Sequence, residues 1–221
     1  MHGGVAVEDI KKPNREGLVK GLANLDKHIK NLQSYGQTVL VAFNRYAGDV
    51  AEEIQAVKDY CAEIGVGFAE NDAYAKGSAG AVDLANLVVD TIEHNPSKPL
   101  KFVYNDDDST EEKIEKVAKN IYGAASVSYA APAKKKLQMI KELGYDKFPI
   151  CIAKTQYSFS TDAKQYCVAS GFDVNVRDIV INAGAEMIVV VAGSIMRMPG
   201  LPKVPAAMHI DIVNGEIEGL S

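Results

Sequence analysis

The chain contains two similar stretches, TVLVAFNRYAGD at residues 38–49 and VGFAENDAYAKG at residues 66–77. Each begins with a short apolar run and continues into a loop that carries a tyrosine, Tyr46 or Tyr74. A continuous apolar run bounded by turn residues is typical of a strand covered on both faces, as in a parallel sheet. Because open α/β sheets bind ligands at the carboxyl ends of their strands, we expect both tyrosines at one mouth. Two rings there would form a slot for a flat heteroaromatic molecule; ordinary packing of each tyrosine is the alternative, and spacing alone does not decide.

Helical patterns alternate with these strands. Leucine and isoleucine at spacings of three and four predict a helix over residues 14–35, which Gly36 ends. Asp49 and Glu52 predict a capping box for a helix between the two strands, giving a right-handed βαβ crossover.

The rest of the chain continues this alternation and then becomes richer in strands. Ser109 with Glu112 predicts a second capping box, and Pro132 and Gly144 bound another helix. Asn214 and Gly215 predict a hairpin turn of type I′. Further strands are expected at residues 100–104, 149–155, 172–176 and 186–192. The sequence therefore predicts an α/β fold, with a mostly parallel sheet, flanking helices and a strand-rich C-terminal third.

Composition narrows the class of protein. The 221 residues carry a net charge of −5, which argues against a nucleic-acid partner or an anionic membrane surface. The apolar run at residues 187–192 is too short to span a bilayer, and charge follows residues 5–7 too soon for a signal peptide. Three cysteines without metal-ligand spacing indicate reduced thiols. We expect a cytoplasmic protein with no nucleic-acid or membrane partner.

Several weaker motifs leave alternatives open. Lys76 and the glycines at 77 and 80 stand at the start of a helix. They would either bind an anion there or simply form a tight turn into the helix. The P-loop pattern is absent. The acidic residues 106–108 lack the glycine spacing of a calcium loop, so we expect solvated surface and no metal site. Polar residues 156–158 follow a strand and are structural or line a cleft, and the proline-rich residues 196–205 wall a pocket or brace the termini.

Six segments together resemble one family, formate–tetrahydrofolate ligase, in its C-terminal part. The similarity extends from Met1 to Leu220. The segments are GLANLDKHIKN, VAFNRYAGD, AYAKGSAG, EEKIEKVAKNIYGA, FPICIAKTQYSFS and MRMPGLPKVPAA.

This resemblance implies an organisation and an activity. Family members join formate to tetrahydrofolate at the expense of ATP, through formyl phosphate, giving 10-formyltetrahydrofolate, ADP and phosphate. Their P-loop and formyl phosphate residues belong to a part that would precede Met1. Residues 1–24 thus resemble the tail of the nucleotide-binding domain, and residues 25–221 the folate-side α/β domain. We expect no catalytic residue in this chain, and ATP with Mg only with the N-terminal P-loop half as partner; homo-oligomers are a further family trait.

The resemblance also assigns site residues. Tyr46 and Tyr74 correspond to the aromatic pair that stacks the pterin ring of tetrahydrofolate, where the family usually has phenylalanine and tryptophan. Ala47 stands where proline is usual, and Glu70 where a leucine often lines the slot; its carboxylate would bond a pterin amine or weaken the site. Lys76 is the candidate for a ligand carboxylate or phosphate.

Two other departures from the family pattern are Ser194 and Arg197, whose effect the sequence leaves open. Because of these departures, two alternatives to a part of a ligase remain open. One is a non-enzymatic folate-binding or assembly module, and the other is a degenerate remnant without a ligand.

Overall fold

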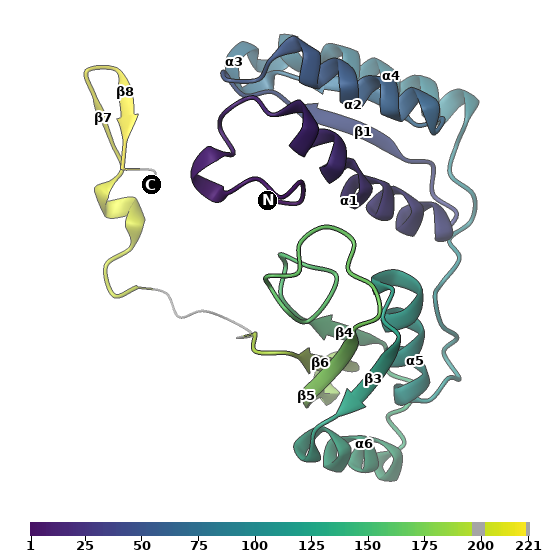
Figure 1. Cartoon of the computed structure of the whole chain (residues 1–221). Coiled ribbons are helices and arrows are strands. Elements are labelled where there is room, and N and C mark those ends of the chain that lie inside the picture. The colour runs from purple at the N-terminus through teal and green to yellow at the C-terminus, as the bar shows by residue number, and fades with distance from the viewer. Residues whose placement is uncertain (196–201, 220–221) are drawn as a thin grey trace.

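The computed structural model describes residues 1–195 and 202–219, which form two α/β units and a C-terminal hairpin (Figure 1). The strands of the two main sheets pair mostly in parallel, which confirms the predicted fold class. No helix within the described ranges is long and apolar enough to cross a membrane.

The first unit contains a two-stranded parallel sheet and the helices that connect and cover it. Leu22 of the first helix packs with Val57 and Cys61 of the second in one buried cluster. A short 3-10 turn, Val7–Asp9, precedes the helices and strands of this unit. They are α1 (Arg15–Ser34), β1 (Leu40–Asn44), α2 (Ala51–Glu63), β2 (Gly67–Asn71), α3 (Ala73–Lys76), the 3-10 turn η2 (Gly77–Ala81) and α4 (Val82–His94). The order confirms the predicted strand–helix–strand unit.

Helix α1 confirms the helix predicted over residues 14–35. Asn14 caps it by accepting a hydrogen bond from the Gly17 N–H, and the helix continues without a break through residue 24. A division of the chain at residue 24 would therefore cut a continuous helix. That division stays a prediction.

The second unit is a four-stranded mixed sheet in the order β3-β5-β6-β4. β5 and β6 pair antiparallel in the middle, and β3 and β4 each add a parallel edge. Its core is fully buried and includes Val174, Val176, Ile179, Ile188 and Val190. The elements are α5 (Thr110–Val117), the π-helical turn η3 (Ala118–Tyr122), β3 (Ser126–Tyr129), α6 (Ala131–Leu143), β4 (Ile150–Ala153), β5 (Asp173–Asn182), the turn η4 (Ala183–Ala185) and β6 (Met187–Ala192).

The C-terminal hairpin is the one that the Asn-Gly pair predicted. β7 (Asp211–Val213) and β8 (Glu216–Glu218) follow the turn η5 (Ala206–His209) and pair antiparallel. Asn214 and Gly215 have φ of 54° and 86°, the positive values that a type I′ turn requires. Residues 196–201 of the proline-rich loop, with Arg197, lie outside the described residues.

One strand prediction was wrong, and one strand was missed. Residues 100–104 do not form a strand; the Lys101 N–H donates to the Tyr35 carbonyl, and this stretch links the two units. β3 was missed because its sequence, SVSY, is half polar and carries no apolar run. Both errors arise because pairing partners, not local composition, decide whether a short segment becomes a strand.

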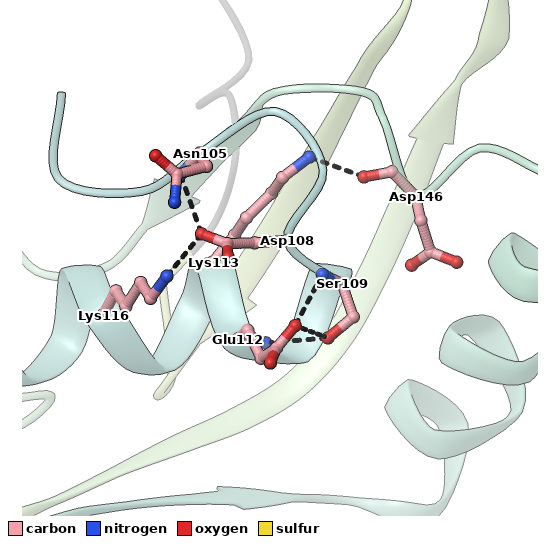
Figure 2. Close-up of polar contacts among 7 residues, drawn as sticks. All are labelled: Asn105, Asp108, Ser109, Glu112, Lys113, Lys116 and Asp146. Atoms are coloured by element: carbon pink, nitrogen blue, oxygen red, sulfur yellow. Dashed lines mark hydrogen bonds and ion pairs between the residues drawn. The ribbon is translucent and has the colours of Figure 1, made fainter.

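The acidic loop before α5 is a structural anchor (Figure 2). Asp108 Oδ2 accepts from the Asn105 N–H at 2.7 Å and from Lys116 Nζ at 2.6 Å. Lys113 Nζ lies buried and donates to the carbonyl oxygens of Asp146 and Phe148, which fastens α5 to the chain before β4. Among the described residues, no group of acidic, histidine or cysteine side chains is arranged to hold a metal ion.

The predicted capping box of α5 is confirmed. Ser109 Oγ accepts from the Glu112 N–H, and Glu112 Oε2 accepts from the Ser109 N–H at 2.8 Å (Figure 2). These hydrogen bonds satisfy two donors at the helix start that otherwise lack partners.

Replacing Ser109 by alanine should therefore lower the free energy of unfolding by about 1 kcal/mol. Ser109→Thr is the matched control, because threonine keeps the hydroxyl acceptor. Urea denaturation followed by circular dichroism measures both variants. Equal midpoints for Ser109→Ala and the unmodified chain would contradict this assignment.

Candidate functional site

The site begins with the edge at which β1 and β2 both end. The last residues of the two strands, Asn44 and Asn71, are partners in the parallel register. Asn71 Nδ2 donates to Asn44 Oδ1 at 2.9 Å, and the Arg45 N–H donates to the Asn71 carbonyl at 3.0 Å. The two loops that follow therefore leave the sheet side by side.

The first loop carries Tyr46 in a tight turn. Its N–H donates to Asp49 Oδ2 at 2.8 Å, and the Asp49 N–H donates back to the Tyr46 carbonyl at 3.0 Å. The predicted role of Asp49 as cap of α2 is wrong, since Val50 is the N-cap and no side chain caps that helix. The Asp49 carboxylate instead closes the tyrosine loop through the Tyr46 N–H.

The second loop presents Tyr74 from the one-turn helix α3. The Lys76 N–H donates to the Asp72 carbonyl, and the Asp72 N–H donates to the Gly80 carbonyl. A Cβ at Gly80 would lie 2.3 Å from the Asp72 carbonyl oxygen, so only glycine fits this closure. Lys76 and its glycines thus form a tight turn around Tyr74.

The two loops enclose an open pocket of about 960 Å³. Both rings are available, since Tyr46 is 75% exposed and Tyr74 is 100% exposed. The lining residues are Asn44, Arg45, Tyr46, Ala47, Asn71, Asp72, Tyr74, Ala75 and Lys76. The structure thus brings together four of the five expected site residues: Tyr46, Ala47, Tyr74 and Lys76.

Glu70, the fifth, lines a neighbouring hollow of about 350 Å³. Its Oε2 lies 3.1 Å from Arg45 Nη1, and Arg45 lines both hollows. Lys76 also lines both, with its Nζ 2.9 Å from Asp72 Oδ2. Three charged residues, Arg45, Asp72 and Lys76, therefore line both hollows.

The lining suits the binding of a flat polar ring. The tyrosines offer aromatic faces, the asparagine amides offer donors and acceptors for the ring's polar edge, and Arg45 and Lys76 offer positive charge. Asp72, the carboxylate of the lining, pairs with Lys76. These groups can bind and orient a molecule.

Residues 156–158, which follow β4, were predicted either to be structural or to line a cleft. They line a hollow of about 270 Å³ together with His28 and Lys154. Lys154 Nζ donates to the carbonyls of Thr155, Ser158 and Ser160 and lies 4.8 Å from the centroid of the Tyr122 ring. Burial lowers the pKa of Lys154 to about 8. With these three carbonyl partners, Lys154 holds the loop after β4 in place. No motif in the sequence predicted this role.

Ser194, one of the departures from the family pattern, is exposed just after β6, and nothing in the structure explains the substitution.

Comparison with known proteins identifies the family. The sequence model described as formate–tetrahydrofolate ligase matches residues 1–221. Proteins named formate–tetrahydrofolate ligase match the full length of this chain in Phocaeicola vulgatus with 62% identity, in Bacteroides fragilis with 59% and in Campylobacter curvus with 49%. The chain spans about 40% of the length of each of these curated relatives. This chain belongs to the formate–tetrahydrofolate ligase family.

Proposed function

We propose that this chain is the folate-binding, C-terminal part of a formate–tetrahydrofolate ligase. The observation that carries the proposal is the convergence of Tyr46 and Tyr74 on one pocket at the carboxyl ends of paired parallel strands. Ligands of open α/β sheets bind at such ends. The pterin ring of tetrahydrofolate is flat and aromatic in part, with polar groups along its edge, and matches this lining.

In this proposal the two tyrosines hold the pterin by stacking. Asn44 and Asn71 line the same pocket at the strand ends, where their amides meet polar atoms of the ring. Lys76 lies on the wall of the pocket and meets a carboxylate of the folate or a phosphate group, sharing its charge with Asp72. The Glu70 carboxylate contributes indirectly, because it holds the Arg45 side chain, which lines both hollows.

The chemistry requires a second part of the enzyme. A folate amine attacks the carbon of formyl phosphate, its C–N bond forms as the C–O bond to phosphate breaks, and the amine loses a proton. We propose that the P-loop part of the ligase makes and holds formyl phosphate with ATP and Mg. The tyrosine pocket contributes by fixing the amine in position, which lowers the entropic part of the barrier.

Tyr74→Ala should weaken tetrahydrofolate binding by 1.4 to 2.7 kcal/mol, or roughly 10- to 100-fold, the range expected when one stacking face is lost. Anaerobic isothermal titration of tetrahydrofolate into the chain measures this loss. Tyr157→Ala is the matched control, since Tyr157 is also exposed but lines the other hollow. Unchanged affinity in Tyr74→Ala would remove the tyrosine pocket from the account.

The purified chain with ATP, formate and tetrahydrofolate should form no 10-formyltetrahydrofolate, and adding the separately produced P-loop part of a relative should start turnover. Product absorbance after acid conversion measures both reactions. Steady turnover by the chain alone would contradict the proposed division of labour. Folate binding without any gain of activity would favour a non-enzymatic folate-binding module. If the chain does not bind folate at all, a degenerate remnant is favoured.

A further inference from the structure

The two α/β units meet through a small set of side chains. Within residues 1–195 and 202–219, no helix or strand of one unit packs extensively against one of the other, and the connection at residues 95–109 joins them. The contacts run from the N-terminal segment and α1 to the loop after β4. We propose that His2 and His28 make this joint a proton-operated switch, closed when both are neutral and open when they are protonated.

His2 accepts a hydrogen bond across the joint. The Cys167 N–H donates to His2 Nδ1 at 2.8 Å, and the Tyr166 ring meets the imidazole edge-on, with the ring centroids 6.0 Å apart. An imidazole nitrogen accepts only when it carries no proton, so His2 is neutral in this geometry. Protonation at Nδ1 would set two N–H donors against each other and remove the bond.

His28 packs its ring against the same loop. The centroids of the His28 and Phe159 rings lie 4.8 Å apart, and Phe159 is buried. Both side chains line the hollow of about 270 Å³ that also holds His2 and Lys154. Part of the His28 ring stays exposed, so protons reach it from solvent. A charge on His28 would stand beside the positive charge of Lys154.

The charged groups that face the two histidines are all positive. Lys27 of α1 and Lys154 of the loop act on His28, and among the described residues that line the hollow none is aspartate or glutamate. Partial burial, and then His2 and the two lysines, lower the pKa of His28; partial burial lowers the pKa of His2. Phenols and thiols are uncharged in the acidic range, and the other titratable groups here are of those kinds: Tyr122, Tyr157, Tyr166 and Cys167.

The direction of the switch follows from these contacts. In the open form, each histidine approaches the ordinary pKa of about 6.5. In the closed form the pKa is lower, so protons bind preferentially to the open form. The closed joint is therefore fully favoured above about pH 6.5, and this advantage is lost as the pH falls through the lowered values.

Little that does not titrate opposes the opening. Asn31 Nδ2 donates to the Ile121 carbonyl at 3.0 Å across the joint. The connection at residues 95–109 contains no helix or strand and would keep the units tethered when they part. The hollow shares no lining residue with the tyrosine pocket, so the switch does not rest on the proposed function.

A pH series on the full chain tests the proposal, with small-angle X-ray scattering and NMR of the histidine rings. From about pH 7.5 to about pH 5, the radius of gyration should rise in one step with a midpoint below about 6.5, while far-UV circular dichroism stays constant. His2 and His28 should titrate with that midpoint and bind protons at least about threefold more weakly than histidine in an unstructured peptide.

A double variant removes the titrating groups and keeps their contacts. His2→Asn retains an acceptor, since Oδ1 of asparagine is as many bonds from Cβ as Nδ1 of histidine, and His28→Phe retains an aromatic ring on Phe159. This variant should stay closed across the pH series. His94→Gln is the control, because His94 is exposed at the end of α4, away from the joint, and this variant should open as the unmodified chain does.

Four results would overturn the inference. They are a constant radius of gyration in the unmodified chain, opening of the double variant at the same pH, proton binding by His2 and His28 as strong as in a free peptide, and loss of circular dichroism with the same midpoint. If the double variant does not fold, the other three measurements still decide. Tetrahydrofolate binding at neutral pH is a separate measurement, so failure of the proposed function is distinguishable.

Discussion

The parallel register of β1 and β2 is the constraint on which the site depends. It places Asn44 beside Asn71 and lets the Arg45 N–H close the last rung between the strands. Tyr46 and Tyr74 are far apart in sequence, and this register alone brings their loops to one pocket. Local hydrogen bonds then fix each loop: Asp49 holds the first, and the Asp72–Gly80 closure holds the second. A shift in register would separate the two rings even if each loop kept its own shape.

The two units differ in how completely they are packed. In the second unit, β5 and β6 supply a continuous core of fully buried residues, and the buried Lys113 fastens α5 to the chain before β4. In the first unit, β1 has no buried residue and β2 has only Ala69. A two-stranded sheet is marginal on its own. The tyrosine pocket thus lies in the less consolidated unit, which any ligand that binds only the folded state would stabilise.

Features set by local sequence were predictable. The capping box of α5, the end of α6 at Gly144 and the type I′ hairpin follow from short motifs, and the structure has all three. The shared location of Tyr46 and Tyr74 was predictable because the ends of parallel strands meet at one edge.

What depends on non-local partners was not predictable. Glu70 pairs with Arg45 in the adjoining hollow, and β3 forms because β5 is available to pair with it. Asp49 accepts from the Tyr46 N–H, three residues before it, although its position also suits a helix cap. The role of Lys154 depends on three carbonyls that only the folded loop assembles.

The most direct measurement is an isotope-filtered NOE spectrum of the chain saturated with tetrahydrofolate. Contacts from pterin protons to the rings of both Tyr46 and Tyr74 are expected in the same complex. Contacts to one ring only, or to residues of the Lys154 hollow in place of both, would contradict the claim that the two strand-end loops form a single folate site.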